Sequence, residues 1–311
     1  MLNLYKLYLK RSAEAKYIYI NKIIGKKKYW FEKYGFKFFY RYFKWRFIFT
    51  HKPSLFHIEY KLTSLCTLKC KDCCHNTPYF KENLNPVSFE TFKNEIDLLL
   101  KSVDRIYVLT LIGGESLLNK DLYKMVKYAR SKKQILFVDI TTNATIIPKE
   151  TLINELKNKK DVFVWVSDYS SNKKLLPKLK QKELLDIFKK NNIKYIFSDF
   201  EENVTPNWIK PPVVCAEKIN KKINITECRL SNCHTFAEGN IYLCPLQFYM
   251  KKSEKYNFLE NEYVDVLNND YKDTTNNILQ YYTKTEFDFC KYCKQPKLDD
   301  FVKPAIQVGE E

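Results

Sequence analysis

Short apolar runs alternate with longer amphipathic stretches between residue 54 and about residue 200. The runs have the length of strands, and the stretches repeat apolar residues every three or four positions, which is the spacing of a helix with one buried face. We predict strands at 56–62, 105–112, 135–141, 162–167 and 193–198, and helices at 88–101, 120–131, 149–157 and 178–191. Repeated strand–helix–strand units predict an α/β fold with a parallel sheet, either open or curled into part of a barrel.

Distinctive residues follow four of these strands. Cysteines follow the first strand, a pair of glycines the second, and polar side chains the third and the fourth. In chain order, the residues after the second to fourth strands are Gly113, Gly114, Thr142, Asn143, Ser167 and Asp168. The carboxyl ends of parallel strands meet at one edge of a sheet, where α/β enzymes hold their active sites. We therefore expect the four segments to form one site.

The cysteines after the first strand are Cys66, Cys70 and Cys73, with the spacing Cys-x3-Cys-x2-Cys. A short loop of this kind can hold three thiolates against one face of a cubane iron–sulfur cluster and leave the fourth iron without a protein ligand. An open iron can coordinate another molecule, as an open metal position does in catalysis. Zinc binding, with Cys74 or His75 as a fourth ligand, and buried free thiols are the alternatives.

The same four segments, within residues 54 to about 200, resemble the motifs of the radical S-adenosylmethionine (radical SAM) superfamily. The cysteine loop resembles the signature of that family. The Gly-Gly-Glu-Ser of residues 113–116 is similar to its Gly-Gly-Glu-Pro motif, and the Thr-Thr-Asn-Ala of residues 141–144 to its Thr-Thr-Asn-Gly segment. The Val-Ser-Asp of residues 166–168 resembles the Ser-x-Asp end of its fourth strand. Departures from the common residues occur at Thr67, Ser116 and Ala144, none of which is a ligand.

This resemblance implies a partial (β/α) barrel over residues 53–205. It implies that the three cysteines bind a [4Fe–4S] cluster and that S-adenosylmethionine (SAM) binds to the fourth iron. The contacts with SAM that it implies are Asp72 to adenine through the backbone, Gly113, Gly114 and Glu115 to the methionine ammonium, and Ser167, Thr142 and Asn143 to the ribose or carboxylate. The implied activity is reductive cleavage of SAM to a 5′-deoxyadenosyl radical, which abstracts hydrogen from a substrate C–H bond.

Six further cysteines lie in residues 206–311, which begin with a proline-containing linker. Ten residues separate Cys228 from Gly239, and four separate Gly239 from Cys244; Cys290 and Cys293 follow much later. Gly239 and Asn240 stand between two short apolar runs and predict a hairpin turn.

The spacing of these cysteines resembles the twitch version of the SPASM extension found in radical SAM enzymes. The resemblance implies a small second domain with an auxiliary [4Fe–4S] cluster, whose implied ligands are Cys228, Cys244, Cys290 and Cys293. Cys233 is the competitor for one of these places, whereas Cys74 and Cys215 are expected to be spare. A structural zinc at the same cysteines is the alternative.

Residues 1–52 carry most of the excess positive charge of the chain. The chain has 53 Lys and Arg against 36 Asp and Glu, and this segment holds 14 of the basic residues, two of the acidic ones and 17 of the 49 aromatic residues. We predict a basic aromatic arm that contacts an anionic membrane surface or a polyanionic glycan carrier. A helical lead-in packed on the main domain is the alternative, and nucleic acid is a less favoured partner.

The longest stretch without a charged residue, 239–250, is too short to cross a bilayer, and no secretory signal opens the chain. We therefore expect a cytoplasmic protein that contacts the inner face of the membrane through its arm.

The expected function is that of a radical SAM oxidoreductase that oxidises or rearranges a sugar or carrier-linked metabolite, with electrons from a flavodoxin or ferredoxin. Asp168 is the candidate base for such an oxidation. Glu59 and Lys61 alternate with apolar residues on the first strand, so we expect them to face the substrate. A radical peptide or protein maturase is the first alternative. A non-enzymatic iron–sulfur or zinc protein that binds a polyanion is the second.

Overall fold

The structure, a computed structural model, covers most of the chain after residue 35. It describes residues 36–197, 208–215, 217–219, 225, 228, 230, 233–254, 256, 262–296 and 300–310. Residues 1–35 of the predicted basic arm lie outside this set, as does Ser198 at the end of the fifth predicted strand. No helix in the described ranges is long and apolar enough to cross a membrane.

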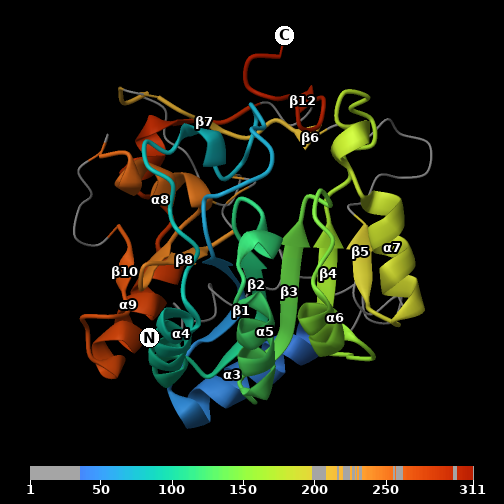
Figure 1. Ribbon diagram of the computed structural model, residues 1–311. Coiled ribbons are helices and arrows are strands. Elements are labelled where there is room, and N and C mark those ends of the chain that lie inside the picture. The colour runs from blue at the N-terminus through green and yellow to red at the C-terminus, as the bar shows by residue number, and fades with distance from the viewer. Residues whose placement is uncertain are drawn as a thin grey trace.

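An open eight-stranded sheet forms the core, with the strand order β10-β9-β8-β1-β2-β3-β4-β5 (Figure 1). Strands β1 to β5 pair in parallel, and β8 joins β1 in parallel, whereas β8–β9 and β9–β10 pair antiparallel. The strands are β1 (Ser54–Lys61), β2 (Arg105–Ile112), β3 (Ile135–Thr142), β4 (Val162–Val166), β5 (Tyr195–Phe197), β8 (Thr235–Ala237), β9 (Asn240–Tyr242) and β10 (Val264–Asp265). The predicted α/β fold with a mostly parallel sheet is confirmed.

Helices connect the parallel strands and pack along the outer face of the sheet. They are α4 (Phe89–Ser102), α5 (Leu122–Ser131), α6 (Glu150–Leu156) and α7 (Gln181–Lys190). The short turns η2 (Thr77–Tyr79), η3 (Ser116–Leu118) and η4 (Leu176–Lys178) lie between a strand and the next helix, before α4, α5 and α7. Ser88 caps α4, because its Oγ accepts a hydrogen bond from the Thr91 N–H at 3.1 Å. Phe92 and Ile96, which lie on one face of this helix, are fully buried.

The two faces of β1 differ in polarity. On the outer face, Tyr60 packs edge-on against Phe92 of α4 and donates its hydroxyl hydrogen to Glu95. On the inner face, His57 Nε2 lies 2.9 Å from Thr110 Oγ1 of β2, and that hydroxyl donates to Asp139 of β3 at 3.1 Å. The inner face of the sheet therefore carries a buried polar chain across three strands, beneath the edge where the strands end.

The C-terminal part of the chain extends the same sheet and adds two small ones. Its helices are α8 (Pro245–Lys252) and α9 (Tyr271–Thr283), with the turn η6 (Phe289–Tyr292). β7 (Val213–Val214) pairs with β11 (Cys293–Lys294), and β6 (Trp208–Ile209) pairs with β12 (Phe301–Val302). β8 and β9 form the predicted hairpin, but its two turn residues are Glu238 and Gly239, both with positive φ, and Asn240, predicted in the turn, begins β9. The division of the chain at residue 205 stays a prediction.

The helix α3 (Phe36–Thr50) lies across the amino ends of the central strands, at the bottom of Figure 1. Phe47 buries its ring in the main core, and Arg46 forms an ion pair with Asp104 at the start of β2. The part of the predicted arm that the structure describes is therefore a helix anchored to the domain by one face.

Candidate active site

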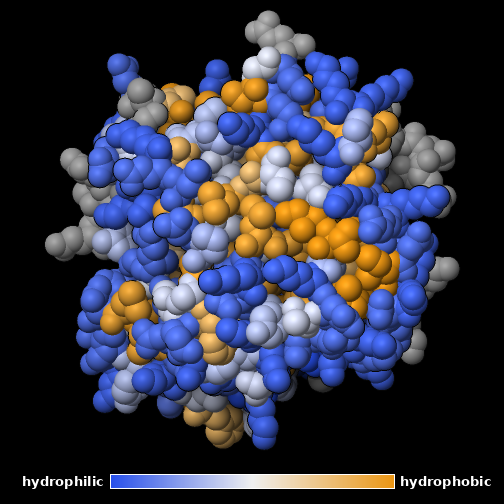
Figure 2. Space-filling model, in the orientation of Figure 1, coloured by the Kyte–Doolittle hydropathy of each residue, from blue (hydrophilic) through white to orange (hydrophobic). Residues whose placement is uncertain are grey.

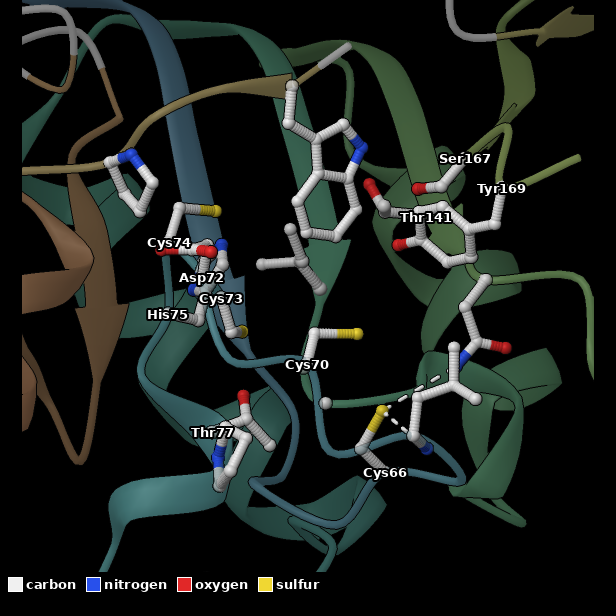
Figure 3. A pocket seen from close by; sticks show the side chains of 18 of the residues that line it. Cys66, Cys70, Asp72, Cys73, Cys74, His75, Thr77, Thr141, Ser167 and Tyr169 are labelled. Atoms are coloured by element: carbon white, nitrogen blue, oxygen red, sulfur yellow. Dashed lines mark hydrogen bonds between the residues drawn. The ribbon is translucent and has the colours of Figure 1, made fainter. Parts of the chain in front are cut away.

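A pocket of about 810 Å³ opens at the carboxyl ends of β1 to β4. All four segments identified from the sequence contribute to its wall, with Cys66, Cys70, Asp72, Cys73, Gly113, Gly114, Thr141, Thr142, Asn143 and Ser167. Figure 3 shows the three thiols directed into one space, with Thr141, Ser167 and Tyr169 across from them. The cysteine loop thus faces polar side chains from the ends of two neighbouring strands, β3 and β4.

The thiols of the cysteine loop are largely enclosed by protein. Burial raises the pKa of Cys66 to about 11 and that of Cys70 to about 12. Cys66 Sγ accepts hydrogen bonds from the Leu68 N–H at 3.4 Å and the Asn143 amide at 3.5 Å. Among the described residues, no three His, Cys, Asp or Glu side chains are arranged to hold a single metal ion. Three thiols spaced in this way suit a metal cluster, in which each thiolate binds a different iron, better than a single ion. Binding of such a cluster would displace the protons of the thiols.

The glycine pair allows the end of β2 to approach the start of the cysteine loop. A Cβ atom on Gly114 would lie 2.2 Å from the Leu65 carbonyl oxygen, and one on Gly113 would lie 2.9 Å from the Thr63 carbonyl oxygen. The Gly114 N–H donates to Thr63 O at 2.9 Å, and the Glu115 N–H donates to Leu65 O at 2.8 Å. Because neither glycine has a side chain, the backbone at the end of β2 can hydrogen-bond directly to the start of the cysteine loop. The same two glycines also form part of the pocket wall.

Glu115 lies behind the pocket wall and holds neighbouring segments of the site together. Its buried carboxylate accepts hydrogen bonds from the Thr142 hydroxyl at 2.9 Å, the Asn143 N–H at 2.7 Å and the Leu117 N–H at 3.0 Å. Burial raises the pKa of this carboxyl, and the three donors oppose that shift. Glu115 therefore ties the end of β3 to the turn after β2.

Replacing Glu115 by alanine should lower the free energy of unfolding by about 3 kcal/mol, because it leaves three donors without their acceptor in a buried region. Denaturant titration of the full chain measures this change, with the exposed Glu82→Ala as the control that should stay near the wild-type value. Equal stability of Glu115→Ala and wild type would contradict the assigned bracing role.

Asn143 connects the third strand to the cysteine loop, because its amide also donates to Thr67 Oγ1 at 3.0 Å. The next residue, Ala144, is fully buried and has a φ of 57°. This is the left-handed region that glycine adopts most easily, so the alanine holds a backbone shape that its side chain disfavours. Thr67 and Ala144, two departures from the common motif, thus both lie at this junction.

The structure does not bring Asp168 to the pocket wall. Its carboxylate accepts a hydrogen bond from the Ser170 N–H at 2.8 Å and another from Gln181 at 3.3 Å. This is the geometry of an aspartate that stabilises its own turn, and we do not assign it as the base. Ser167, the residue before it, does line the pocket.

A buried charged group beside the pocket includes one residue that the sequence singled out only as a zinc ligand. His75 lines the pocket and lies 3.8 Å from the carboxylate of Glu59. Burial, followed by the charge of Lys61, holds the pKa of His75 well below its usual range, and burial also lowers the pKa of Lys61. Lys61 Nζ has no hydrogen-bond partner among the described residues. The alternation of polar and apolar residues along β1 predicts that Glu59 and Lys61 point inward. The position of His75 is set by the end of the cysteine loop, which no such pattern predicts.

The C-terminal tail is a second feature that the sequence did not identify. The Val308 N–H donates to Lys69 O, and the Lys71 N–H donates to Ile306 O, both at 2.7 Å. Cys70 and Gln307 form an isolated antiparallel bridge between these bonds. Because more than 230 residues separate the partners, no local pattern signals the contact.

A second group of thiols forms in the C-terminal part. Burial raises the pKa of Cys244, Cys290 and Cys293, and the charges of neighbouring cysteines, including Cys228, raise each of them further. Gln295 Nε2 lies 3.5 Å from Cys228 Sγ and 3.3 Å from Cys293 Sγ. Cys233, the alternative ligand, instead lines the first pocket.

Part of the chain that contains these motifs is similar in sequence to known proteins. Residues 60–199 match the family model described as "Radical SAM superfamily". The GTP 3′,8-cyclase of Campylobacter lari is 31% identical over 99 residues, which cover 30% of this chain and 29% of that protein. The GTP 3′,8-cyclase of Sulfurovum sp. is 29% identical over 104 residues, which cover 32% of this chain and 30% of that protein. The match thus spans less than a third of these relatives' length.

Two solved structures align with this chain at low sequence identity. Streptococcus suis SuiB bound to S-adenosylmethionine aligns with a TM-score of 0.40 and 18% identity, over 53% of this chain and 38% of that one. BtrN in complex with AdoMet and 2-DOIA aligns with a TM-score of 0.45 and 18% identity, over 82% of this chain and 98% of that one.

Proposed function

We propose that the chain is a radical SAM enzyme, which cleaves SAM reductively and oxidises or rearranges a substrate through a C–H bond, because residues 60–199 match the model of that superfamily. When bound, a [4Fe–4S] cluster and SAM together supply the one-electron chemistry that generates a hydrogen-abstracting radical. The observation that carries the proposal is the convergence of three thiols, the glycine pair and Ser167 on one pocket. The test is the formation of 5′-deoxyadenosine from SAM by the reduced, anaerobically reconstituted chain.

Within this proposal, Cys66, Cys70 and Cys73 hold the cluster. The residues proposed to contact SAM all line the pocket; they are Asp72, Gly113, Gly114, Thr142, Asn143 and Ser167. Glu115 acts indirectly, by fixing the side-chain hydroxyl of Thr142 and the backbone N–H of Asn143. The aromatic side chains of Trp165, Tyr169 and Trp208 complete the wall and exclude water from the site.

We propose a polar substrate, such as a sugar or a carrier-linked metabolite. His75 supports this, because its imidazole lines the pocket, 3.8 Å from the buried Glu59 carboxylate, and its ring nitrogens can form hydrogen bonds with hydroxyl groups. A peptide substrate is the alternative. Neighbouring genes for sugar nucleotides or glycosyltransferases would support the sugar proposal, and a gene for a short precursor peptide next to this one would contradict it.

An auxiliary [4Fe–4S] cluster on Cys228, Cys244, Cys290 and Cys293 completes the proposed cofactor set. The contact of the Gln295 amide with both Cys228 and Cys293 supports it, as do the burial of Cys244 and Cys290 and the position of Cys233 in the other pocket. Such a cluster would accept the electron that a substrate radical must lose for net oxidation. For the electron donor we propose an acidic flavodoxin or ferredoxin, since the chain has a net charge of +17.

The N-terminal arm is proposed to contact anionic membrane from the cytoplasmic side. The described part of the arm supports this contact, because α3 exposes Trp45, Ile48 and Phe49 next to the exposed Arg41. Figure 2 shows apolar atoms at the lower edge of the molecule, where α3 lies in Figure 1. The pocket opens at the opposite ends of the strands. A chain bound through α3 would therefore direct its pocket away from the bilayer, toward a substrate in the aqueous phase.

Full-length protein should sediment with anionic vesicles at low salt and less so at high salt, because each lysine near such a surface contributes roughly 1 kcal/mol that salt screens. Ile48→Ser with Phe49→Ser should weaken this binding, and the control Leu176→Ser should not, since Leu176 is equally exposed (48%, like Ile48) but lies beyond the carboxyl end of β4. Full-length protein that stays in the supernatant at low salt would contradict the membrane proposal.

A further inference from the structure

We infer that two glutamines outside every motif, Gln307 and Gln295, donate hydrogen bonds to cysteine thiolates and adjust the reduction potentials of two clusters separately. The inference rests on the proposed function, since it requires clusters on these cysteines. Gln307 Nε2 lies 3.6 Å from Cys70 Sγ in the first pocket. Gln295 Nε2 lies 3.3 Å from Cys293 Sγ and 3.5 Å from Cys228 Sγ in the second group. Each proposed cluster thus has one side-chain amide directed at its thiols.

The orientation of the Gln307 amide follows from its other partners. Its Oε1 accepts a hydrogen bond from the Lys69 N–H at 2.7 Å, which only an oxygen can do. Its Nε2 donates to the carbonyl oxygen of Ala305 at 2.6 Å. An inverted amide would place two donors against each other at one contact and two acceptors at the other. The group that faces Cys70 is therefore the N–H donor.

The tail holds Gln307 in place on both sides. The backbone bonds of Ile306 and Val308 to the cysteine loop flank it, and Ala305 is fully buried against Leu68, Cys70 and Tyr169. A donor fixed in this way does not have to be ordered when a cluster binds, so its dipole acts on the thiolate at little entropic cost.

A hydrogen bond to a thiolate favours the more negatively charged state of a cluster. Reduction adds one electron, and part of the added charge resides on the sulfur ligands. Donors directed at those sulfurs therefore raise the reduction potential, and their removal lowers it. Gln307 would act in this way on the cluster that reduces SAM, and Gln295 on the auxiliary cluster.

The test is a redox titration of the reconstituted full-length chain, followed by electron paramagnetic resonance (EPR), for Gln307→Leu and Gln295→Leu. At a fixed potential, Gln307→Leu should lower the ratio of reduced to oxidised radical SAM cluster about three- to tenfold; tenfold corresponds to about 59 mV for one electron. Gln295→Leu should leave the ratio for the radical SAM cluster unchanged and lower the ratio of reduced to oxidised auxiliary cluster. The SAM-dependent change of the spectrum identifies the first signal, and a Cys66→Ala, Cys70→Ala and Cys73→Ala background isolates the second.

A further variant separates donation from anchoring of the tail. Val308→Pro removes the N–H that donates to Lys69 O but leaves the Gln307 amide intact. If Gln307 only anchors the tail, Val308→Pro should lower the potential as much as Gln307→Leu does; we expect it to change the potential little. Unshifted potentials in both glutamine variants with loaded clusters would overturn the inference and leave the proposed function intact. Wild-type protein that assembles no cluster would contradict the proposed function instead.

Discussion

Replacing Cys66, Cys70 and Cys73 together by alanine is expected to reduce SAM cleavage by the anaerobically reconstituted chain to background. The three thiols supply the whole protein ligand set of the proposed cluster, and all three line the pocket. Without the cluster, the chain cannot deliver an electron to SAM in the pocket. The measurement is 5′-deoxyadenosine formed per chain after reduction.

The matched control is Cys74→Ala, which removes the next thiol in the chain from the same pocket wall. It should retain both iron and SAM cleavage, because Cys74 lies outside the proposed ligand spacing. Cleavage by the triple variant at the wild-type rate would remove the basis for the assignment. Loss of activity in Cys74→Ala equal to that in the triple variant would show that the ligand set has been assigned wrongly.

The same triple variant should still bind about four irons, held by the second group of thiols. Adding Cys228→Ala and Cys293→Ala should remove this residual iron, since these two thiols, which both contact the Gln295 amide, are half of the proposed ligand set. Cys233→Ala is the control and should keep it, because Cys233 lines the other pocket. Iron and zinc analysis of the purified variants provides the readout. About one zinc per chain with no residual iron would mean that these cysteines are structural.

Much of the fold follows from local patterns in the sequence. Apolar periodicity places the parallel strands and their helices within a few residues, because a buried strand and an amphipathic helix each need a particular spacing of apolar residues. The parallel order then brings the ends of β1 to β4 to one edge, so the positions of Cys66, Gly114, Asn143 and Ser167 at one pocket can be anticipated.

Other parts of the site depend on contacts that no local pattern reports. Asp168 follows a pocket residue in the sequence, yet its carboxylate accepts hydrogen bonds from the Ser170 N–H and the Gln181 amide. Glu115 belongs to a recognisable motif, but its role in tying two strands together becomes visible only through its partners. Gln307 reaches the cysteine loop from the far end of the chain. Each case depends on where a side chain points or on a contact distant in sequence.

The most direct test of the central claim is the EPR spectrum of the reduced, reconstituted wild-type chain with and without SAM. We predict that SAM changes the spectrum, because it binds the iron that Cys66, Cys70 and Cys73 leave without a protein ligand. The change should disappear in the Cys66→Ala, Cys70→Ala and Cys73→Ala variant while the auxiliary signal remains. Identical spectra of the wild-type chain with and without saturating SAM would contradict the claim that this pocket joins a cluster to SAM.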